Sequence, residues 1–494
     1  MIYPVRLFLG PRAIIFMLCS PQFRRQTPRS VKPHYCYRAK WAKWAISPIR
    51  CGAVSSTPAV AKHVNSAELG CASYAISPPG TGLADTSPTN LIYRKCANMI
   101  KFALFALALL AVVSFYHKRL TRVYHVVTLF YADRIVANFR AMDSMFHTAA
   151  ISRAPVAHVF ERAPIPLPET FTHRGQTQQI ATWLSETWTT GLVVLRDGKI
   201  TYEDYYRGND HATRTISWSL AKSFISALAG IAVAEGHIVS IQDPVSQYVP
   251  ALKDTGYDDV PIKDVLQMSS GIRFDEDYTA FFSDINRMGR AIAFDTSIDA
   301  FIASLKNERP SGTYNHYVSM DTQVLAMVVS QATGESIRDY TESRLWHKIG
   351  MEADAYWLLD GRGVELAFGG LNAVLRDYAR FGQLYLQEGM WNSTQVVPRE
   401  WVRASRTPDA PHLLPGPNAA STSKFGYGYQ WWIPPEPDGD FLGIGIYNQY
   451  IYVYPRYNVV IAKSSAYPNY DSDGDERTMQ SIAAFRTIAA RGGK

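Results

Sequence analysis

Residues 219–236, with the sequence SLAKSFISALAGIAVAEG, are apolar on nearly every face of a helix. A helix without a polar face must be buried on all sides, so the rest of the chain has to fold around it. Gly236 is placed to end this helix. With 494 residues, 47% of them hydrophobic, the chain is long enough to supply a large core. The sequence therefore predicts a globular domain built on a central helix.

Segments rich in β-forming residues occur on both sides of this helix. Asp197 and Gly198 separate the first two segments and are a strong hairpin signal. The predicted strands are residues 191–196, 200–206, 441–454 and 457–464, and the predicted flanking helices are residues 178–187 and 477–491. Strands at both ends of a mainly helical region indicate an antiparallel sheet assembled from the two ends, with a helical insertion between them.

Residues 1–98 differ in composition from the rest of the chain. They carry 13 of the 50 lysines and arginines, only two acidic residues and all five cysteines. Because they show no helical or strand periodicity, we expect them to be poorly structured. Two interpretations remain open: an overlong gene start, with the body of the protein beginning at or after Met99, and a basic targeting segment.

Residues 102–116 (FALFALALLAVVSFY) carry no charge and have basic residues on both sides. This segment is short for a spanning helix of about 20 residues and typical of the apolar part of a signal peptide. A buried helix of a soluble domain is the alternative. We expect a signal-anchor, transmembrane or signal segment at 99–117, with the catalytic domain outside the cytoplasm, on the periplasmic side. The flanking charges do not fix the orientation.

Beyond residue 98 the charges nearly balance, with 37 basic and 41 acidic residues. No basic surface for nucleic acid is expected in this part. The twelve histidines include no HExxH motif or paired spacing, which argues against a metal site. The sequence also lacks a glycine-rich phosphate loop or dinucleotide motif, so no cofactor is implied.

Ser219 and Lys222 stand three residues apart at the start of the predicted central helix. That spacing puts both side chains on one face, where the amine can reach the hydroxyl. Free N–H groups and the helix dipole in the first turn favour a developing alkoxide on Ser219. Burial would lower the pKa of Lys222 and make it a proton acceptor. A capping serine beside a solvent-directed lysine is the alternative, because the Ser-x-x-Lys spacing often occurs by chance.

Several segments follow this pair in order. They are VLQMSSG at 265–271, SGTYNHYVSMDTQVL at 311–325, FGGLNAVLRDYARFGQLYLQEG from 368, FGYGYQWW from 425 and FLGIGIYNQYIYVYP from 441. With the Ser-x-x-Lys pair they resemble the β-lactamase-related serine hydrolases, which include penicillin-binding proteins, class C β-lactamases, family VIII esterases and 6-aminohexanoate-dimer hydrolases. The resemblance spans about residues 165–490. It implies an α/β (α+β) fold of the β-lactamase/transpeptidase type, with an antiparallel sheet, flanking terminal helices and an inserted, mainly helical subdomain.

The resemblance implies a role for each matched residue. Ser219 matches the serine that is acylated, and Lys222 matches the lysine beside it. Tyr317 matches the tyrosine of the family's Y-x-N element, which shuttles a proton between nucleophile and leaving group. Ser319 stands where that element usually has Asn, and its shorter hydroxyl can still form a hydrogen bond to the lysine or the substrate.

The family's third element, a Lys/His-Thr/Ser-Gly triplet on a core strand, is absent, and Gly445-Ile446-Tyr447 takes its place. Gly445 would let a substrate approach the strand edge. The backbone N–H of Ile446 would join that of Ser219 in an oxyanion hole, and Tyr447 would contact the substrate. The triplet's cation, a partner for a substrate carboxylate, is lost. This arrangement is closer to the esterases and oligomer hydrolases of the family.

Tyr278 and Asp284, which follow the MSSG segment in the sequence, are further candidates for the substrate pocket, as the resemblance to the oligomer hydrolases implies. An exposed position on the helical insertion is an equally open interpretation for both.

Together these observations predict four regions: an extension at 1–98, a membrane or signal segment at 99–117, a juxtamembrane linker at 118–164 and a hydrolase domain at 165–490. The predicted function is hydrolysis of an ester or amide bond of a small molecule through an acyl-enzyme on Ser219. A penicillin-recognising D,D-peptidase or β-lactamase and a catalytically idle, membrane-tethered binding domain are the alternatives. The sequence does not indicate the oligomeric state.

Overall fold

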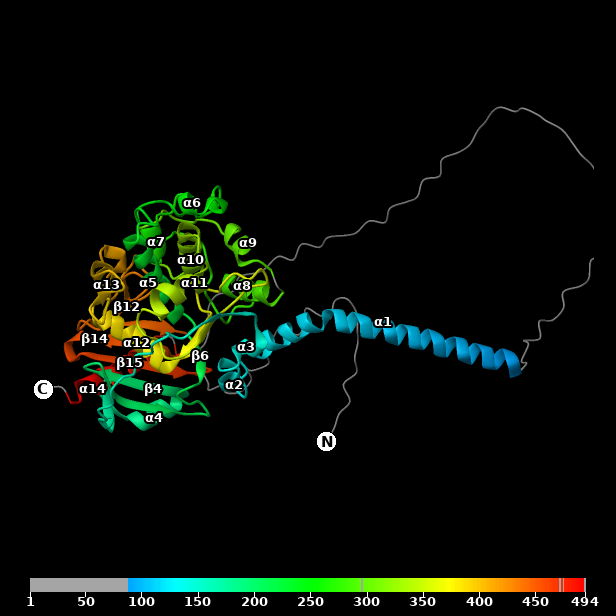
Figure 1. Ribbon diagram of the computed structural model, residues 1–494, viewed down its shortest axis with the longest axis horizontal. Helices are drawn as coiled ribbons and strands as arrows, with labels where there is room; N and C mark the ends of the chain where they lie inside the picture. Colours follow the sequence, from blue (N-terminus) through cyan, green and yellow to red (C-terminus); the bar gives the residue numbers. More distant parts are fainter. Residues whose placement is uncertain (1–87, 295, 471, 474, 493–494) are drawn as a thin grey trace, which may run out of the picture. The chain divides into compact units, whose positions relative to one another are not determined.

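The computed structural model describes residues 88–294, 296–470, 472–473 and 475–492 (Figure 1). Residues 113–494 form one compact unit. The expectation of a poorly structured extension at 1–98 lies mostly outside the described residues.

A seven-stranded antiparallel sheet is the centre of this unit (Figure 1). In spatial order its strands are β11 (Gly426–Tyr427), β12 (Trp432–Ile433), β13 (Phe441–Gly445), β14 (Gln449–Tyr454), β15 (Val459–Ser465), β4 (Thr189–Arg196) and β5 (Lys199–Tyr205). Strands from both ends of the domain therefore share one sheet, which confirms the predicted arrangement. Each predicted strand segment overlaps an observed strand.

One predicted β segment is divided by a turn. Residues 441–454 form two strands, β13 and β14, which pair from Phe441↔Val453 to Gly445↔Gln449. Tyr447 and Asn448 between them have φ values of 63° and 68°. Positive φ at two successive residues matches the tight turns that join antiparallel strands. The apolar sequence around Tyr447 hid this turn, because tyrosine is uncommon in that conformation.

Helices cover both faces of the sheet (Figure 1). On one face, α4 (Ile180–Glu186) and α14 (Glu476–Ala490) enclose a core of large apolar residues from the helices and the strands. On the other face lie α5 (Leu220–Ala234) and α12 (Leu375–Leu386). Because side chains of a strand alternate between faces, Val460 and Ala462 of β15 join the α5 core and Ile461 joins the α4 and α14 core.

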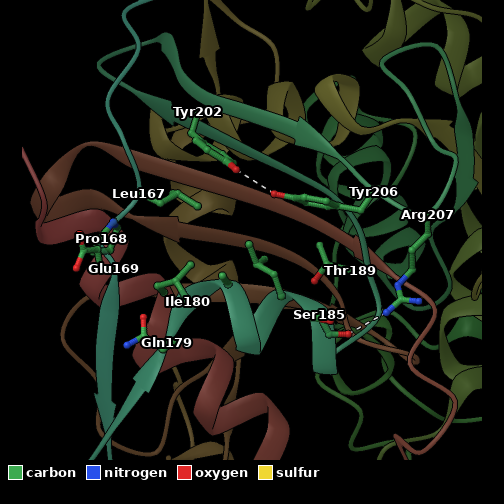
Figure 2. Close-up of a pocket in the computed structure, with 12 residues that line it drawn as sticks. Leu167, Pro168, Glu169, Gln179, Ile180, Ser185, Thr189, Tyr202, Tyr206 and Arg207 are labelled. Atoms are coloured by element: carbon green, nitrogen blue, oxygen red, sulfur yellow. Dashed lines mark hydrogen bonds between the residues drawn. The ribbon is translucent and has the colours of Figure 1, made fainter.

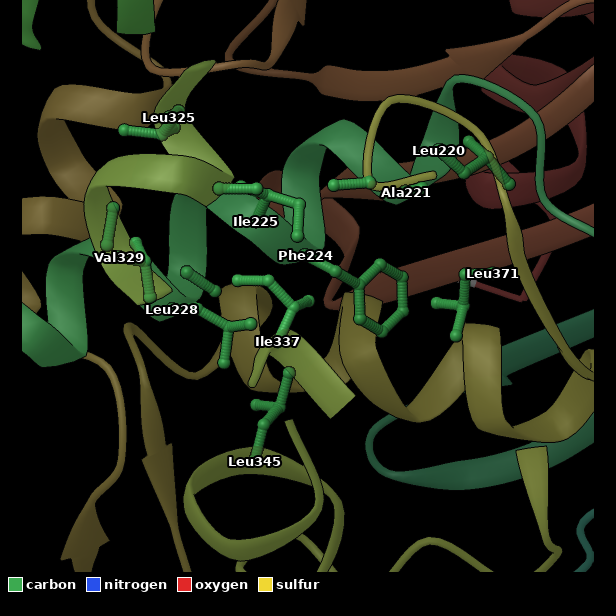
Figure 3. Close-up of a cluster of buried hydrophobic side chains, with 14 of the residues drawn as sticks. Leu220, Ala221, Phe224, Ile225, Leu228, Leu325, Val329, Ile337, Leu345 and Leu371 are labelled. Carbon is green, nitrogen blue, oxygen red and sulfur yellow. The ribbon is translucent and has the colours of Figure 1, made fainter. Parts of the chain in front are cut away.

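The central helix α5 is buried as its sequence predicts. Each residue from Leu220 to Ala232 is buried. Figure 3 shows Phe224, Ile225 and Leu228 of α5 within one cluster that also includes Leu325 and Val329. Helix α5 thus needs no polar face, because it packs against the sheet on one side and against the helical insertion on the other.

The insertion between the two groups of sheet strands is mainly helical. Its helices are α6 (Val245–Tyr248), α7 (Ile262–Leu266), α8 (Asp284–Ala293), α9 (Ile298–Ala303), α10 (Ser319–Thr333), α11 (Ile337–Thr341) and α13 (Arg399–Ser405). A second antiparallel sheet contains β1 (Thr148–Ile151), β7 (Ala355–Leu358), β8 (Leu371–Val374) and β6 (Arg214–Ile216), in that order. Two short hairpins pair β2 (Thr170–His173) with β3 (Gln176–Gln179), and β9 (Met390–Trp391) with β10 (Thr394–Gln395).

Helix α1 (Pro88–Thr128) contains the apolar segment predicted from the sequence. Its residues Ile92–His117 are long and apolar enough to cross a membrane, with a mean hydropathy of 2.2. A signal sequence near the N-terminus satisfies the same criterion.

The region predicted as a linker, 118–164, contains regular structure. Helices α2 (Ile135–Phe139) and α3 (Met142–Met145) lie in it. Strand β1 then pairs with β7, with Thr148 opposite Leu358. The apolar residues Ile135, Phe139 and Met142 are buried, and their burial against the domain explains why this region is ordered.

Candidate active site

Ser219 lies at the N-terminal end of α5, and the chain before it fixes its position. Ser217 N donates a hydrogen bond to Leu371 O at 2.8 Å, continuing the pairing of β6 with β8. Trp218 then adopts a left-handed backbone conformation, with φ of 47°. A bulky residue rarely takes this conformation, and backbone strain of this kind concentrates at functional sites. The chain thus turns sharply from strand to helix at Ser219.

Lys222 lies in the first turn of α5 and is only 2% exposed. Its Nζ is 3.1 Å from Ser219 Oγ and donates a second hydrogen bond to Phe368 O at 2.7 Å. Burial lowers the pKa of Lys222 from its ordinary value to about 7, although Glu276 and Asp321 act in the opposite direction. At neutral pH a large share of Lys222 is therefore an uncharged amine that can accept a proton from Ser219.

Tyr317 completes the cluster. Its ring centroid is 5.1 Å from Lys222 Nζ, and the ring stacks on Trp432 with centroids 5.4 Å apart. Burial and the charge of Glu276 raise the pKa of Tyr317, and a hydrogen bond with Ser219 offsets part of this increase. Tyr317 therefore keeps its proton at neutral pH and is available as a donor. The structure brings Ser219, Lys222 and Tyr317 together, as the sequence predicted.

Ser319 is held by Glu276, a residue that the sequence analysis did not single out. Ser319 Oγ donates to Glu276 Oε1 at 2.5 Å, and Ser319 N donates to Glu276 Oε2 at 3.0 Å. Tyr278 OH also donates to Glu276 Oε1, at 2.7 Å. Glu276 thus fixes two of the predicted pocket residues and adds a negative charge that raises the pKa of both Lys222 and Tyr317.

A second carboxyl group, Asp321, is buried on α10. Burial raises the pKa of Asp321 to about 8, although hydrogen bonds from Ser270 and Tyr257 oppose the shift. Tyr257 OH donates to Asp321 Oδ1 at 2.8 Å. At neutral pH Asp321 is mostly protonated, so Glu276 is the carboxylate with the larger influence on Lys222.

Comparisons with known proteins identify the family to which this arrangement belongs. The β-lactamase family model matches residues 184–484. A 6-aminohexanoate-dimer hydrolase from Paenarthrobacter ureafaciens is 30% identical over 342 residues, which cover 68% of this chain and 86% of that protein. This chain belongs to the β-lactamase-related serine hydrolase family.

A further relative and a solved structure are also similar to this chain. A β-lactamase from Pseudomonas fluorescens is 24% identical over 171 residues, covering 33% of this chain and 44% of that protein. The solved structure of a proposed 6-aminohexanoate-dimer hydrolase from Bacillus anthracis has a TM-score of 0.66 and 24% identity, covering 73% of this chain and 95% of its own. The structural similarity confirms the predicted fold of an antiparallel sheet with a helical insertion.

The segment that replaces the family's triplet lies at the end of β13, next to Ser219. A Cβ atom on Gly445 would lie 2.5 Å from Ser217 O, so only glycine lets the strand approach the backbone that leads to the nucleophile. Ile446 and Tyr447 line the same cavity as Ser219. The oxyanion-hole role of the Ser219 and Ile446 N–H groups stays a prediction.

Asp284 is not brought to the nucleophile. Its Oδ2 accepts a hydrogen bond from Asp275 N at 3.0 Å, and its Oδ1 pairs with Arg287 at 2.6 Å. These contacts order the start of α8. Tyr278, in contrast, lines two cavities that also include Ser219. Of the two candidates after the MSSG segment, Tyr278 thus lies beside Ser219, whereas Asp284 lies at the start of a helix.

Two cavities meet at Ser219. The first, called the polar cavity, has a volume of about 180 Å³ and includes Ser219, Glu276, Tyr317, Tyr447 and Asn448 in its lining. The second, called the apolar cavity, has a volume of about 150 Å³ and includes Ser219, Leu129, Met142, Phe146, Ile285 and Met288. Among the described residues, neither lining contains a lysine or an arginine. Apart from Lys222 beside Ser219, these described lining residues thus offer no cation to a substrate carboxylate.

A larger groove of about 500 Å³ lies elsewhere in the domain (Figure 2). It is bordered by Leu167, Ile180, Tyr202 and Tyr206, and the two tyrosine hydroxyls are 2.9 Å apart. None of the candidate catalytic residues lines this groove. Among the described residues there is also no group of three or more His, Cys, Asp or Glu side chains that could hold a metal ion.

Proposed function

We propose that this chain hydrolyses ester or amide bonds of small, uncharged molecules through an acyl-enzyme on Ser219. The observation that carries the proposal is the 3.1 Å approach of Lys222 Nζ to Ser219 Oγ. Burial brings the pKa of Lys222 to about 7, so the neutral amine is abundant at physiological pH. A positioned base beside a serine hydroxyl is the arrangement that activates a nucleophile.

In the proposed reaction, Ser219 Oγ attacks the carbonyl carbon while its proton passes to Lys222 Nζ. The backbone N–H groups of Ser219 and Ile446 stabilise the resulting oxyanion. Tyr317 donates its proton to the leaving oxygen or nitrogen, takes the proton held by Lys222, and the bond to the leaving group breaks. Water then attacks the acyl-enzyme and gives one proton, through Lys222 or Tyr317, to Ser219 Oγ as the bond from Oγ to the acyl group breaks and the acid is released.

The charges of the site favour uncharged substrates. A cation facing a substrate carboxylate contributes about 1.5–3 kcal/mol, or about 10- to 150-fold in transition-state binding. Both cavities lack such a cation among their described residues, and Glu276 adds a negative charge. Small esters lose nothing from this absence, whereas penicillins and D-Ala-D-Ala peptides lose their orienting contact. Hydrolysis of linear amides is supported separately, by the 6-aminohexanoate-dimer hydrolase that is 30% identical to this chain.

A substrate panel tests this proposal. Nitrophenyl esters, the cephalosporin nitrocefin and linear amides are compared on the purified full chain, with Ser219→Ala as the matched control. We expect kcat/KM for short esters to be well above that for nitrocefin, and we expect Ser219→Ala to remove both activities. Faster hydrolysis of nitrocefin than of any ester would show that another cation replaces the missing one.

We also propose that Ile92–His117 anchors the chain in a membrane or directs its export, with the hydrolase domain outside the cytoplasm. The length and composition of this helix support its insertion into a membrane or its use in export. Cell fractionation is the test. We expect the protein in the membrane fraction, or in processed form beyond the cytoplasm, and an uncleaved protein confined to the cytosol would contradict the proposal.

A further inference from the structure

The two cavities share the candidate nucleophile but differ in most of their other lining residues. Ser219, Tyr278 and Ile446 line both, so the cavities meet where a substrate carbonyl would have to bind. A carbonyl carbon attacked by Ser219 carries two substituents, the acyl chain and the leaving group. Each cavity can therefore hold one of them.

The position of Tyr317 decides which substituent enters which cavity. Tyr317 lines the polar cavity and is absent from the lining of the apolar cavity. The leaving group must lie beside the group that protonates it, because proton transfer requires hydrogen-bond reach. The leaving group thus occupies the polar cavity. We infer that the apolar cavity is the binding site for an uncharged acyl chain of about six carbons, an inference that rests on the proposed hydrolysis through Ser219.

The walls of the apolar cavity fit a hydrocarbon chain. Its lining includes Ile285 and Met288 of α8 and Leu366, all buried. No Asp, Glu, Lys or Arg occurs among the described residues that line it. A charged acyl group would lose its hydration there without gaining a charged partner, whereas apolar surface gains free energy on burial.

One side of this cavity comes from a part of the chain that precedes the family match at 184–484. Leu129 and Met142 from this part are buried in the lining. Phe139 next to them packs against the ring of Trp218, with centroids 5.3 Å apart. The pairing of β1 with β7 fixes the end of the same segment. The segment before residue 148 thus forms a fixed wall of the acyl site, and its sequence sets the depth of the site.

The volume of the cavity sets the length of the chain. An apolar cavity of about 150 Å³ in a protein core holds a benzene molecule, which has six carbons. The apolar cavity here has the same volume, about 150 Å³. A hexanoyl group or a group of similar size therefore fills it, and a much longer chain exceeds it.

Gly289 of α8 gives a way to fill the cavity. It lines the apolar cavity, and a Cβ atom built on it meets no other atom within 4 Å. A larger side chain at this position therefore enters open space without a clash, and glycine is the less favourable residue in a helix. Gly289→Leu should occupy part of the acyl site. Ala300→Leu on α9, at an exposed position, adds the same side chain away from the cavity and is the matched control.

The experiment measures kcat/KM for nitrophenyl esters from acetate to dodecanoate on the purified full chain. For the wild type we expect an increase of about fourfold per added methylene up to about six carbons, followed by a decrease. Gly289→Leu should lower the ratio of hexanoate to acetate turnover at least tenfold, and Ala300→Leu should keep the wild-type ratio. If esters are hydrolysed but kcat/KM does not increase for acyl chains longer than acetate, the assignment of the acyl site is wrong while the proposed function stands.

Two further results are informative. A wild-type optimum at hexanoate that Gly289→Leu leaves in place would overturn the assignment of this cavity. If Gly289→Leu does not fold, Gly289→Val and the wild-type series decide the question in the same way. Absence of both ester and amide turnover, with no labelling of Ser219, would instead overturn the proposed function.

Discussion

Lys222 and Lys463 are both buried, but they lie on opposite faces of the central sheet. Lys222 belongs to α5 on one face, and Lys463 of β15 points to the other face, over the rings of Trp183 and Tyr450. Burial lowers the pKa of both lysines. Lys222 has a serine hydroxyl 3.1 Å away, a tyrosine beside it and two cavities in front of that serine.

The surroundings of Lys463 are different. Its Nζ contacts Ser465 Oγ of the same strand, and it lines neither of the two cavities at Ser219. A lowered pKa therefore does not by itself identify a catalytic lysine. The difference between the two lysines is access: only Lys222 combines a neutral amine with a hydroxyl that a substrate can reach.

Replacing each lysine separately gives the largest expected contrast. Lys222→Ala removes the base beside Ser219 and should lower kcat/KM for a short ester by about 10³-fold, within the range typical of general-base catalysis. Lys463→Met removes an amine that no substrate reaches and should leave kcat/KM within about twofold. Equal losses in both variants, measured with nitrophenyl acetate, would contradict the functional distinction between the two lysines.

Tyr317→Phe tests the proton donor beside Lys222. The variant keeps the ring that stacks on Trp432 and removes only the hydroxyl. We expect kcat/KM for esters to fall by about 10²-fold, with a larger loss for amides because an amine leaving group depends more on protonation. Full activity on amides would show that Tyr317 does not deliver the proton.

The pH dependence of kcat/KM should reflect Lys222 and not Lys463. Lys222 must be neutral to act as a base, so kcat/KM should rise with pH through about 7, the pKa of Lys222. Glu276 favours the protonated lysine, and Glu276→Gln should therefore move this rise to lower pH. Lys463→Met should leave the profile in place. A shift to higher pH in Glu276→Gln would contradict the assigned electrostatics.

The smallest expected effect concerns stability. Because burial lowers the pKa of Lys463, unfolding at neutral pH lets this amine take up a proton. The unfolded state then binds more protons, so this lysine costs stability that is recovered as the pH rises toward the ordinary lysine value. Lys463→Met should raise the Tm at pH 7 by about 2 °C or more, with a smaller gain at pH 10. A lower Tm in the variant at pH 7 would show that the amine stabilises the fold.

The sequence predicted the parts of the site that depend on local spacing. Ser219 and Lys222 stand one helical turn apart, and Tyr317 belongs to a recognisable segment, so all three were predicted from the sequence. Glu276 was not, because the run of acidic residues around it has the composition of an exposed turn. Only tertiary folding brings its carboxylate to Ser319 N and Oγ.

The fold was predicted to a similar extent. The sheet strands and the central helix follow from periodicity, whereas the apolar residues of 118–164 alternate with polar ones without a clear period. Phe130 and Phe139 pack against Tyr447, each with centroids 5.1 Å apart, and such contacts between distant parts of the chain leave no local signal. The turn at Tyr447 was missed for a different reason, because tyrosine rarely adopts a positive φ and the sequence around it is apolar.

The most direct test of the central claim is labelling by a fluorophosphonate, which phosphonylates activated serines with loss of fluoride, followed by peptide mapping. We predict one adduct, on Ser219, that forms at the wild-type rate in Lys463→Met and at least 10²-fold more slowly in Lys222→Ala. An adduct on another serine, or labelling of Ser219 that does not depend on Lys222, would contradict the account.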